Sequence, residues 1–150
     1  MRFILVDSII ELVPGKNIIA AKTLTAGEEI FLDHFPSFPV VPGVLLTEMM
    51  AQAAGKCLDA ERKPRGKAML ARIKSAGFHH WVLPDQKLTI FAEIKNNQDS
   101  YATAECRIEA ENKRVCKSEL FFGFLSYDHL APDFRDEILE NFLAAKLAAK

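Results

Sequence analysis

Three side chains within residues 33–55 have types that can move a proton or orient a group that does. His34 lies in the proline-rich stretch DHFPSFPVVPG, and Glu48 and Gln52 interrupt the long apolar run that follows. Being four residues apart, Glu48 and Gln52 share one face of a helix, one turn from each other. Burial favours the protonated form of a carboxyl group, so Glu48 is a candidate general acid and Gln52 is suited to orient it.

The residues around this pair favour a catalytic role. Pro36 and Pro39 restrict the backbone that carries His34, so the imidazole can be held without a regular element. Pro42-Gly43 begins the apolar run, and the first turn of a helix exposes N–H groups that can stabilise negative charge on an acyl oxygen. A base, a buried acid and such donors suit removal of a proton next to a carbonyl with loss of a β-hydroxyl. A solvent-facing Glu48 and a structural His34 are the alternatives that residue types alone leave open.

The chain has the composition of one globular domain. It has 150 residues, 49% of them hydrophobic, and its 19 basic and 20 acidic side chains leave a net charge of −1, which favours neither nucleic acid nor an anionic membrane. The three cysteines, at positions 57, 106 and 116, lack metal-ligand spacing and are expected to be reduced core thiols. No apolar segment reaches the roughly 18 residues of a membrane span, and no signal-peptide core is present, so the cytoplasm is the expected location.

Hydrophobic patterning predicts an α+β fold. Residues 44–58 form an apolar helix that must be central, residues 17–25 a strand, and residues 6–12 a single helical turn. Extended runs follow at 68–82, 87–97 and 101–124, the last broken at 111–113, and residues 101–110 alternate with a period of two. We expect an antiparallel meander with the long helix on one face. An amphipathic helix from residue 133, begun by Ala-Pro-Asp, carries Phe134, Leu139, Ile138, Phe142, Leu143 and Leu147.

The segment HFPSFPVVPGVLLTEMMAQAAG resembles the signature of the FabZ-type β-hydroxyacyl-acyl-carrier-protein dehydratases, H-F-P-G-x-P-x-x-P-G-V followed by E-x-x-x-Q. The resemblance covers roughly residues 2–124. It implies the hot-dog fold, a long central helix wrapped by an antiparallel sheet. We expect a hot-dog domain at 1–126, extended by an amphipathic helical segment at 127–150.

The resemblance also implies the roles of the site residues. His34 would take the C2 proton of a 3-hydroxyacyl thioester, Glu48 would protonate the departing hydroxyl, and the N–H groups near Gly43 and Val44 would stabilise the thioester oxygen. Gln52 would orient Glu48. Phe78 would line or gate an apolar tunnel, with ordinary core packing as the alternative. No metal or organic cofactor is implied. The expected assembly is a homodimer, often three dimers, with His34 of one subunit facing Glu48 of the other.

The chain departs from the family pattern in two regions. Asp33 and Ser37 stand where glycines flank the His-Phe-Pro core, so a backbone position with positive φ falls on one of these residues. His79, His80 and Trp81 follow Phe78 in place of basic residues, so docking of the acidic acyl carrier protein would be weaker or would depend on pH. The candidate docking residues are Arg72, Lys74, His79 and His80. Further candidates are Arg62, Lys63, Arg65 and Lys67, with a plain solvated turn as the alternative. A hot-dog thioesterase and a non-catalytic acyl-binding module are the competing functions.

Overall fold

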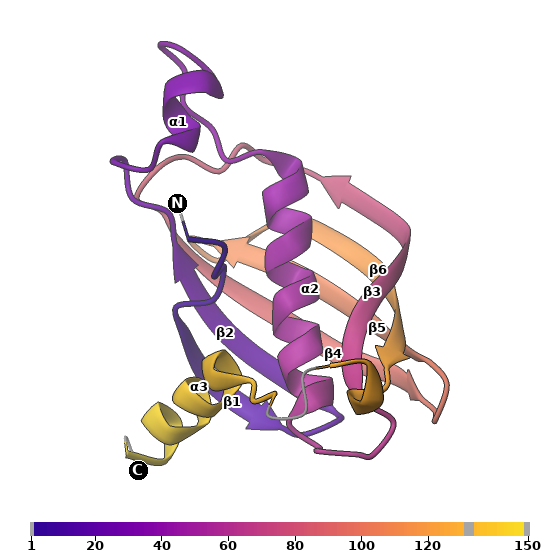
Figure 1. Cartoon of the computed structure of the whole chain (residues 1–150). Helices are drawn as coiled ribbons and strands as arrows, with labels where there is room; N and C mark the ends of the chain where they lie inside the picture. Colours follow the sequence, from indigo (N-terminus) through magenta and orange to yellow (C-terminus); the bar gives the residue numbers. More distant parts are fainter. Residues whose placement is uncertain (1, 131–133, 149–150) are drawn as a thin grey trace.

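One antiparallel sheet curves around a single long helix in the computed structural model, which describes residues 2–130 and 134–148 (Figure 1). The strand order is β1-β2-β4-β5-β6-β3. Their bounds are Ser8–Val13 for β1, Asn17–Thr23 for β2, Lys67–Phe78 for β3, Lys87–Asn97 for β4, Ala102–Ala110 for β5 and Lys113–Leu125 for β6. The predicted α+β class and the β4-β5-β6 meander are confirmed.

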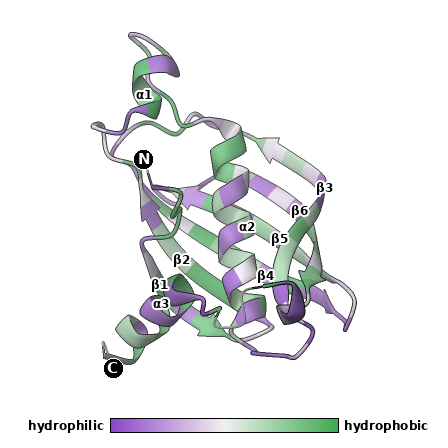
Figure 2. Ribbon diagram, in the orientation of Figure 1, coloured by the Kyte–Doolittle hydropathy of each residue, from purple (hydrophilic) through white to green (hydrophobic). Residues whose placement is uncertain are grey.

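The central helix α2, Gly43–Asp59, lies across the concave face of the sheet (Figure 1). Ten of its 17 residues are buried, so it forms the middle of the core rather than a surface layer. Figure 2 shows apolar residues over much of α2 and the strands behind it. The predicted helix of residues 44–58 is therefore confirmed to within one residue at each end. Four of its polar residues share one half-buried side, at Glu48, Gln52, Lys56 and Asp59.

The strand predicted from the alternating residues 101–110 is observed as β5. In β5 the even-numbered residues point into the core, and all five are buried: Ala102, Ala104, Cys106, Ile108 and Ala110. Cys57 and Cys116 are buried too, and all three cysteines are free, as predicted. Burial raises the pKa of Cys57 to about 11 and the pKa values of Cys106 and Cys116 to about 12, so these thiols are poor nucleophiles at neutral pH.

The single helical turn predicted for residues 6–12 is wrong. Residues Ser8–Val13 form β1, which pairs with β2 in an antiparallel register that begins at Ser8↔Ala21 and ends at Val13↔Asn17. The turn between them needs Gly15, whose φ is +71°, and the hairpin supplies β1 with hydrogen bonds that an isolated helical turn would lack. A short helix α1, Ile30–Asp33, was not predicted.

The C-terminal helix α3 spans Glu137–Ala148 and lies beside β1 (Figure 1). The predicted start at residue 133 falls outside the described residues, while Asp136 Oδ1 accepts the N–H of Leu139 at 3.0 Å and caps the helix. Leu139 is buried and Phe142 packs against the core, but Phe134, Ile138 and Leu147 are substantially exposed. Only part of the predicted apolar stripe is covered. None of the described helices has the length and apolarity needed to cross a membrane.

Candidate active site

His34 directly follows α1, at the start of the loop that leads into α2. Its Nδ1 lies 2.9 Å from the carbonyl oxygen of Val40, and the N–H of Val40 donates to the carbonyl of His34 at 3.0 Å. A carbonyl oxygen only accepts, so Nδ1 carries the proton and Nε2 of the neutral ring presents a lone pair. The ring also stacks on Phe35, with centroids 4.0 Å apart, and the His34–Phe35 peptide bond is cis. The loop thus fixes the imidazole in the tautomer that a general base requires.

The positive φ expected in this loop falls on Ser37, at +64°. Phe35 and Phe38 exchange two backbone hydrogen bonds of 3.0 Å, which close the turn around it. Asp33 ends α1 and is exposed, with no hydrogen bond or ion pair to His34 in the described part of the chain. Of the two departures from the family's glycines, only Ser37 requires a left-handed backbone.

Replacing Ser37 by glycine is expected to raise the free energy of unfolding by about 0.5–1 kcal/mol, because glycine adopts positive φ without the steric cost that serine carries. Thermal or urea unfolding measures the change. Ser37→Ala retains the Cβ and is the matched control. A Ser37→Gly protein no more stable than Ser37→Ala would mean that the turn is not strained by the side chain.

Glu48 is held by Gln52, as the spacing predicted. Gln52 Nε2 donates to Glu48 Oε1 at 3.1 Å and to the carbonyl of Phe3 at 3.1 Å, while Gln52 Oε1 accepts the N–H of Leu5 at 2.9 Å. The amide thus ties the carboxylate to the N-terminal segment and fixes its direction. The second carboxylate oxygen has no hydrogen-bond donor among the described residues. The sequence could not predict that Phe3 and Leu5 bind Gln52, because they lie 49 and 47 residues away from it in the chain.

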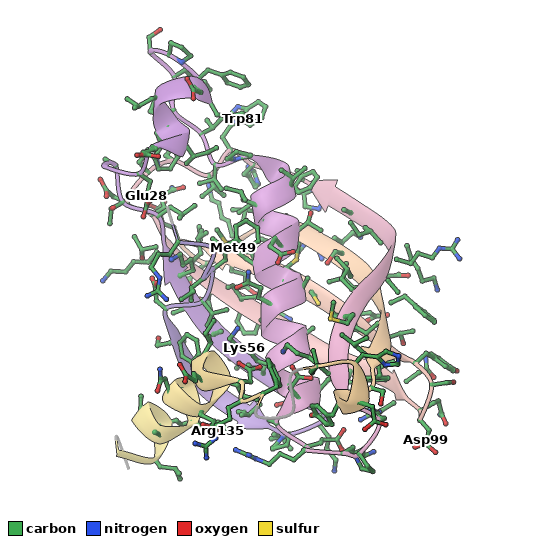
Figure 3. All side chains as sticks on the ribbon, viewed as in Figure 1. Glu28, Met49, Lys56, Trp81, Asp99 and Arg135 are labelled. Atoms are coloured by element: carbon green, nitrogen blue, oxygen red, sulfur yellow. The ribbon has the colours of Figure 1, made fainter. Side chains whose placement is uncertain are left out.

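Glu48 and Gln52 open onto a cavity of about 430 Å³ along the half-buried side of α2. Glu48 is therefore half-buried within one chain, not sealed in the core. Apolar side chains of the N-terminal segment and of β3 line the cavity, among them Phe3, Met69 and Leu70. Figure 3 shows Lys56 on the lower part of α2, and Lys56 lines the same cavity. Among the described residues that line this cavity, His34 does not appear.

A larger hollow of about 570 Å³ lies on the outer face of the sheet. Charged side chains line much of it, including Glu93, Glu105, Arg107 and Lys117. It contains none of the predicted site residues, and its charged lining does not suit an apolar acyl chain. The smaller cavity beside Glu48 is the better candidate for the site.

Gly43, Val44 and Phe78 meet at the N-terminal end of α2. The carbonyl of Pro42 accepts the N–H groups of Leu45 and Leu46, while those of Gly43 and Val44 lack an acceptor in the described residues. A Cβ on Gly43 would lie 3.1 Å from atoms of the Phe78 ring, so the glycine lets this half-exposed ring approach the helix start. Along the helix, the free N–H groups lie about 7 Å from Glu48. This end of α2 is suited to bind an acyl oxygen.

The predicted docking residues differ in their exposure and in their ion pairs. Arg72, Lys74, His79 and His80 are all exposed, and no ion pair involves them within the described chain. Arg65 and Lys67 are instead structural.

Arg65 has a side chain only 6% exposed that pairs with Glu61 at 3.2 Å, and Lys67 pairs with Asp59 at 2.7 Å and Asp136 at 2.8 Å. Both side chains are held by ion pairs within the domain, so they fit neither a free docking surface nor the solvated turn that was the alternative. In the described residues, no three His, Cys, Asp or Glu side chains come together as metal ligands.

Known proteins resemble most of this chain. Residues 1–119 match the family model of the FabA-like domain. A Listeria welshimeri protein named 3-hydroxyacyl-[acyl-carrier-protein] dehydratase FabZ is 37% identical over 122 residues, covering 81% of this chain and 85% of the relative. The Clostridioides difficile protein of that name is 34% identical over 124 residues, 82% of this chain and 87% of its own.

Two solved structures share the fold at low sequence identity. The Escherichia coli PaaI protein of the phenylacetic acid degradation operon is 16% identical with a TM-score of 0.64, and 79% of each chain is covered. The dehydratase heterocomplex ApeI:P from Xenorhabdus doucetiae is 17% identical with a TM-score of 0.67, covering 85% of this chain and 87% of that chain. These similarities establish the hot-dog fold.

Proposed function

Because the chain belongs to the FabA-like family, as a FabZ-type dehydratase, we propose that it converts 3-hydroxyacyl-acyl carrier protein into the trans-2-enoyl thioester and water. The observation that carries this proposal is Glu48, aligned by Gln52 and opening with one free oxygen onto a largely apolar cavity. Fatty-acid synthesis or a related lipid pathway, in the cytoplasm, is the proposed setting. Residues 1–126 would form the catalytic domain, and residues 127–150 its extension.

The proposed reaction uses groups already present in the chain. Nε2 of His34 takes the C2 proton, and the electron pair moves toward the thioester carbonyl, whose oxygen is stabilised by the N–H groups of Gly43 and Val44. The pair then forms the C2–C3 double bond as the C3–O bond breaks, and Glu48 gives its proton to the leaving hydroxyl. Water departs, and transfer of the proton from His34 to Glu48 restores both groups. The thioester itself acidifies C2, so no cofactor is expected.

The site is proposed to require two copies of the chain. His34 does not line the cavity that holds Glu48, so in a single chain the base and the acid do not share a site. At the sheet edge, β3 is open to solvent and exposes Met69 at 47%, Leu70 at 38% and Ile73 at 49%. An apolar edge strand is a template for pairing with another chain. A dimer formed through β3 would bring His34 of one copy toward Glu48 of the other, and three such dimers are the larger assembly that the family implies.

Carrier-protein docking is proposed to use the exposed basic residues in the middle of β3, Arg72 and Lys74. Replacing Arg72 and Lys74 by glutamate is expected to lower kcat/KM for the acyl-carrier substrate about tenfold, because the acidic carrier loses a complementary surface. The same variant should process an acyl-pantetheine normally. Lys16→Glu, an equally exposed site at the β1–β2 turn, is the matched control. Equal losses with both substrates would contradict a docking role.

The two histidines that follow β3 belong to the same proposed docking surface. His79 and His80 are both exposed.

One assay separates the candidate functions. Incubation of the protein with a 3-hydroxyacyl-acyl carrier protein should yield the enoyl thioester. Free acid in its place would indicate a thioesterase. Binding without any product would indicate an acyl-binding module, and would end the proposal of a dehydratase.

A further inference from the structure

The cavity beside Glu48 continues along α2 and ends at the C-terminal segment. Glu48, Gln52, Gly55, Lys56 and Asp59 all line it, at spacings that place them along one side of the helix. From Glu48 to Lys56 the helix rises about 12 Å. We call this side of the cavity, from Glu48 to Lys56, the track. An acyl chain whose reacting carbons lie at Glu48 can extend along the track only until it reaches Lys56.

The middle of this track is apolar and open. A Cβ built on Gly55 meets no atom within 4 Å, so space lies directly over the helix at this point. Apolar side chains line both sides of the opening: Phe3, Ile4, Ala68, Met69, Leu70 and Phe122. This is the lining that an unbranched hydrocarbon chain would find favourable.

The far end is closed by charge and by residues at the start of α3. Lys67 pairs with Asp59 at 2.7 Å and with Asp136 at 2.8 Å, and Ile138 lines the same end. Burial alone would lower the pKa of Lys67, but its hydrogen bonds to Asp136 and Asp59 outweigh burial and raise it. Displacing these hydrogen-bonded charges with methylene groups would leave them unpaired, which is costly. A hydrocarbon chain therefore has to stop here.

We propose that the segment entering α3, through Asp136 and Ile138, forms the end wall of the acyl groove and limits the enzyme to medium-length acyl chains. The proposal rests on the dehydratase function and identifies the residues that set its substrate range. Gly55 keeps the track open, and the Lys67–Asp136 pair closes it. The limit arises outside the residues 1–119 that match the family model, because both wall residues lie in the C-terminal extension.

Kinetics across chain lengths test the proposal. We would measure kcat/KM for 3-hydroxybutanoyl, 3-hydroxydecanoyl and 3-hydroxyhexadecanoyl carrier protein. The unmodified enzyme should prefer decanoyl to hexadecanoyl by at least about tenfold, a discrimination that a few methylenes can supply. Gly55→Leu should lower the decanoyl-to-butanoyl ratio about tenfold, since the new side chain fills the track. Ile138→Ala should raise the hexadecanoyl-to-decanoyl ratio.

Gly27→Leu is the matched control, because a Cβ at Gly27 also meets no atom within 4 Å but the residue lies in a turn away from the cavity. This variant should leave all ratios unchanged. Leucine favours helix over glycine, so Gly55→Leu should fold at least as stably, which thermal unfolding checks. If Gly55→Leu lost turnover by the same factor at all three chain lengths, the proposed groove would be overturned. If the unmodified enzyme were as active on the hexadecanoyl substrate as on the decanoyl substrate, the proposed end wall would be overturned.

Failure of the groove and failure of the function can be told apart. If the unmodified protein dehydrates none of the substrates, the proposed function fails, and the groove is then tested by calorimetric binding of saturated acyl-pantetheines of the same lengths. Decanoyl binding that weakens in Gly55→Leu but not in Gly27→Leu would support the groove. Equal binding by both variants would overturn it.

Discussion

Replacing Glu48 by glutamine is expected to lower kcat for dehydration about 10²- to 10⁴-fold, the range typical of a lost general acid. Glutamine has nearly the same shape, and its carbonyl can still accept the 3.1 Å hydrogen bond from Gln52. Substrate binding and the unfolding temperature should therefore change little. Steady-state kinetics with enoyl formation as the readout measure the effect, and circular dichroism confirms folding.

His34→Ala should cause a loss of similar size, because it removes the base that the loop holds by the Nδ1 contact to Val40. Asp33→Asn is the control: it removes a charge from the neighbouring residue, which has no bond to His34 among the described contacts. Its activity should stay within about twofold of the unmodified enzyme.

A folded Glu48→Gln enzyme that kept more than a tenth of its activity would exclude Glu48 as the proton donor.

Elements with strong local patterns could be predicted from the sequence. The helix of residues 44–58 and the alternating strand at 101–110 follow from side-chain period alone, because the core selects one face of each. By contrast, β1 becomes a strand through its pairing with β2, and α1 is a single turn of four residues. Neither leaves a periodic signal long enough to identify.

The contact between Glu48 and Gln52 could be predicted from their spacing, but their contacts with the rest of the fold could not. The motif around His34 and Glu48 identifies both side chains, and the positive φ at Ser37 follows from the glycine it replaces. The link between Gln52 and the N-terminal segment, and the pairing of Lys67 with Asp136, join residues 47 to 69 positions apart. Such contacts depend on the folded sheet and leave no spacing in the sequence.

The two-chain site makes a prediction that a single-chain site does not. His34→Ala and Glu48→Gln subunits should each be nearly inactive alone, but a dimer that contains one of each retains one intact pair, His34 from the second subunit and Glu48 from the first. Co-expressed in equal amounts, about half of the dimers are mixed and half of their sites are intact, so about a quarter of the normal activity should return. If both groups came from one chain, no mixture would recover activity.

Mixing the unmodified chain with a chain that carries both substitutions gives the complementary control. In a shared site every mixed dimer is inactive, because each of its two sites takes one residue from the doubly substituted chain. Activity should then fall to about a quarter, whereas independent sites within each chain would keep about half. The two mixtures together distinguish a shared site from a change in expression or assembly, since only a shared site predicts recovery in one and excess loss in the other. No recovery in the first mixture together with about half of the activity in the second would contradict every arrangement in which His34 and Glu48 act across the interface.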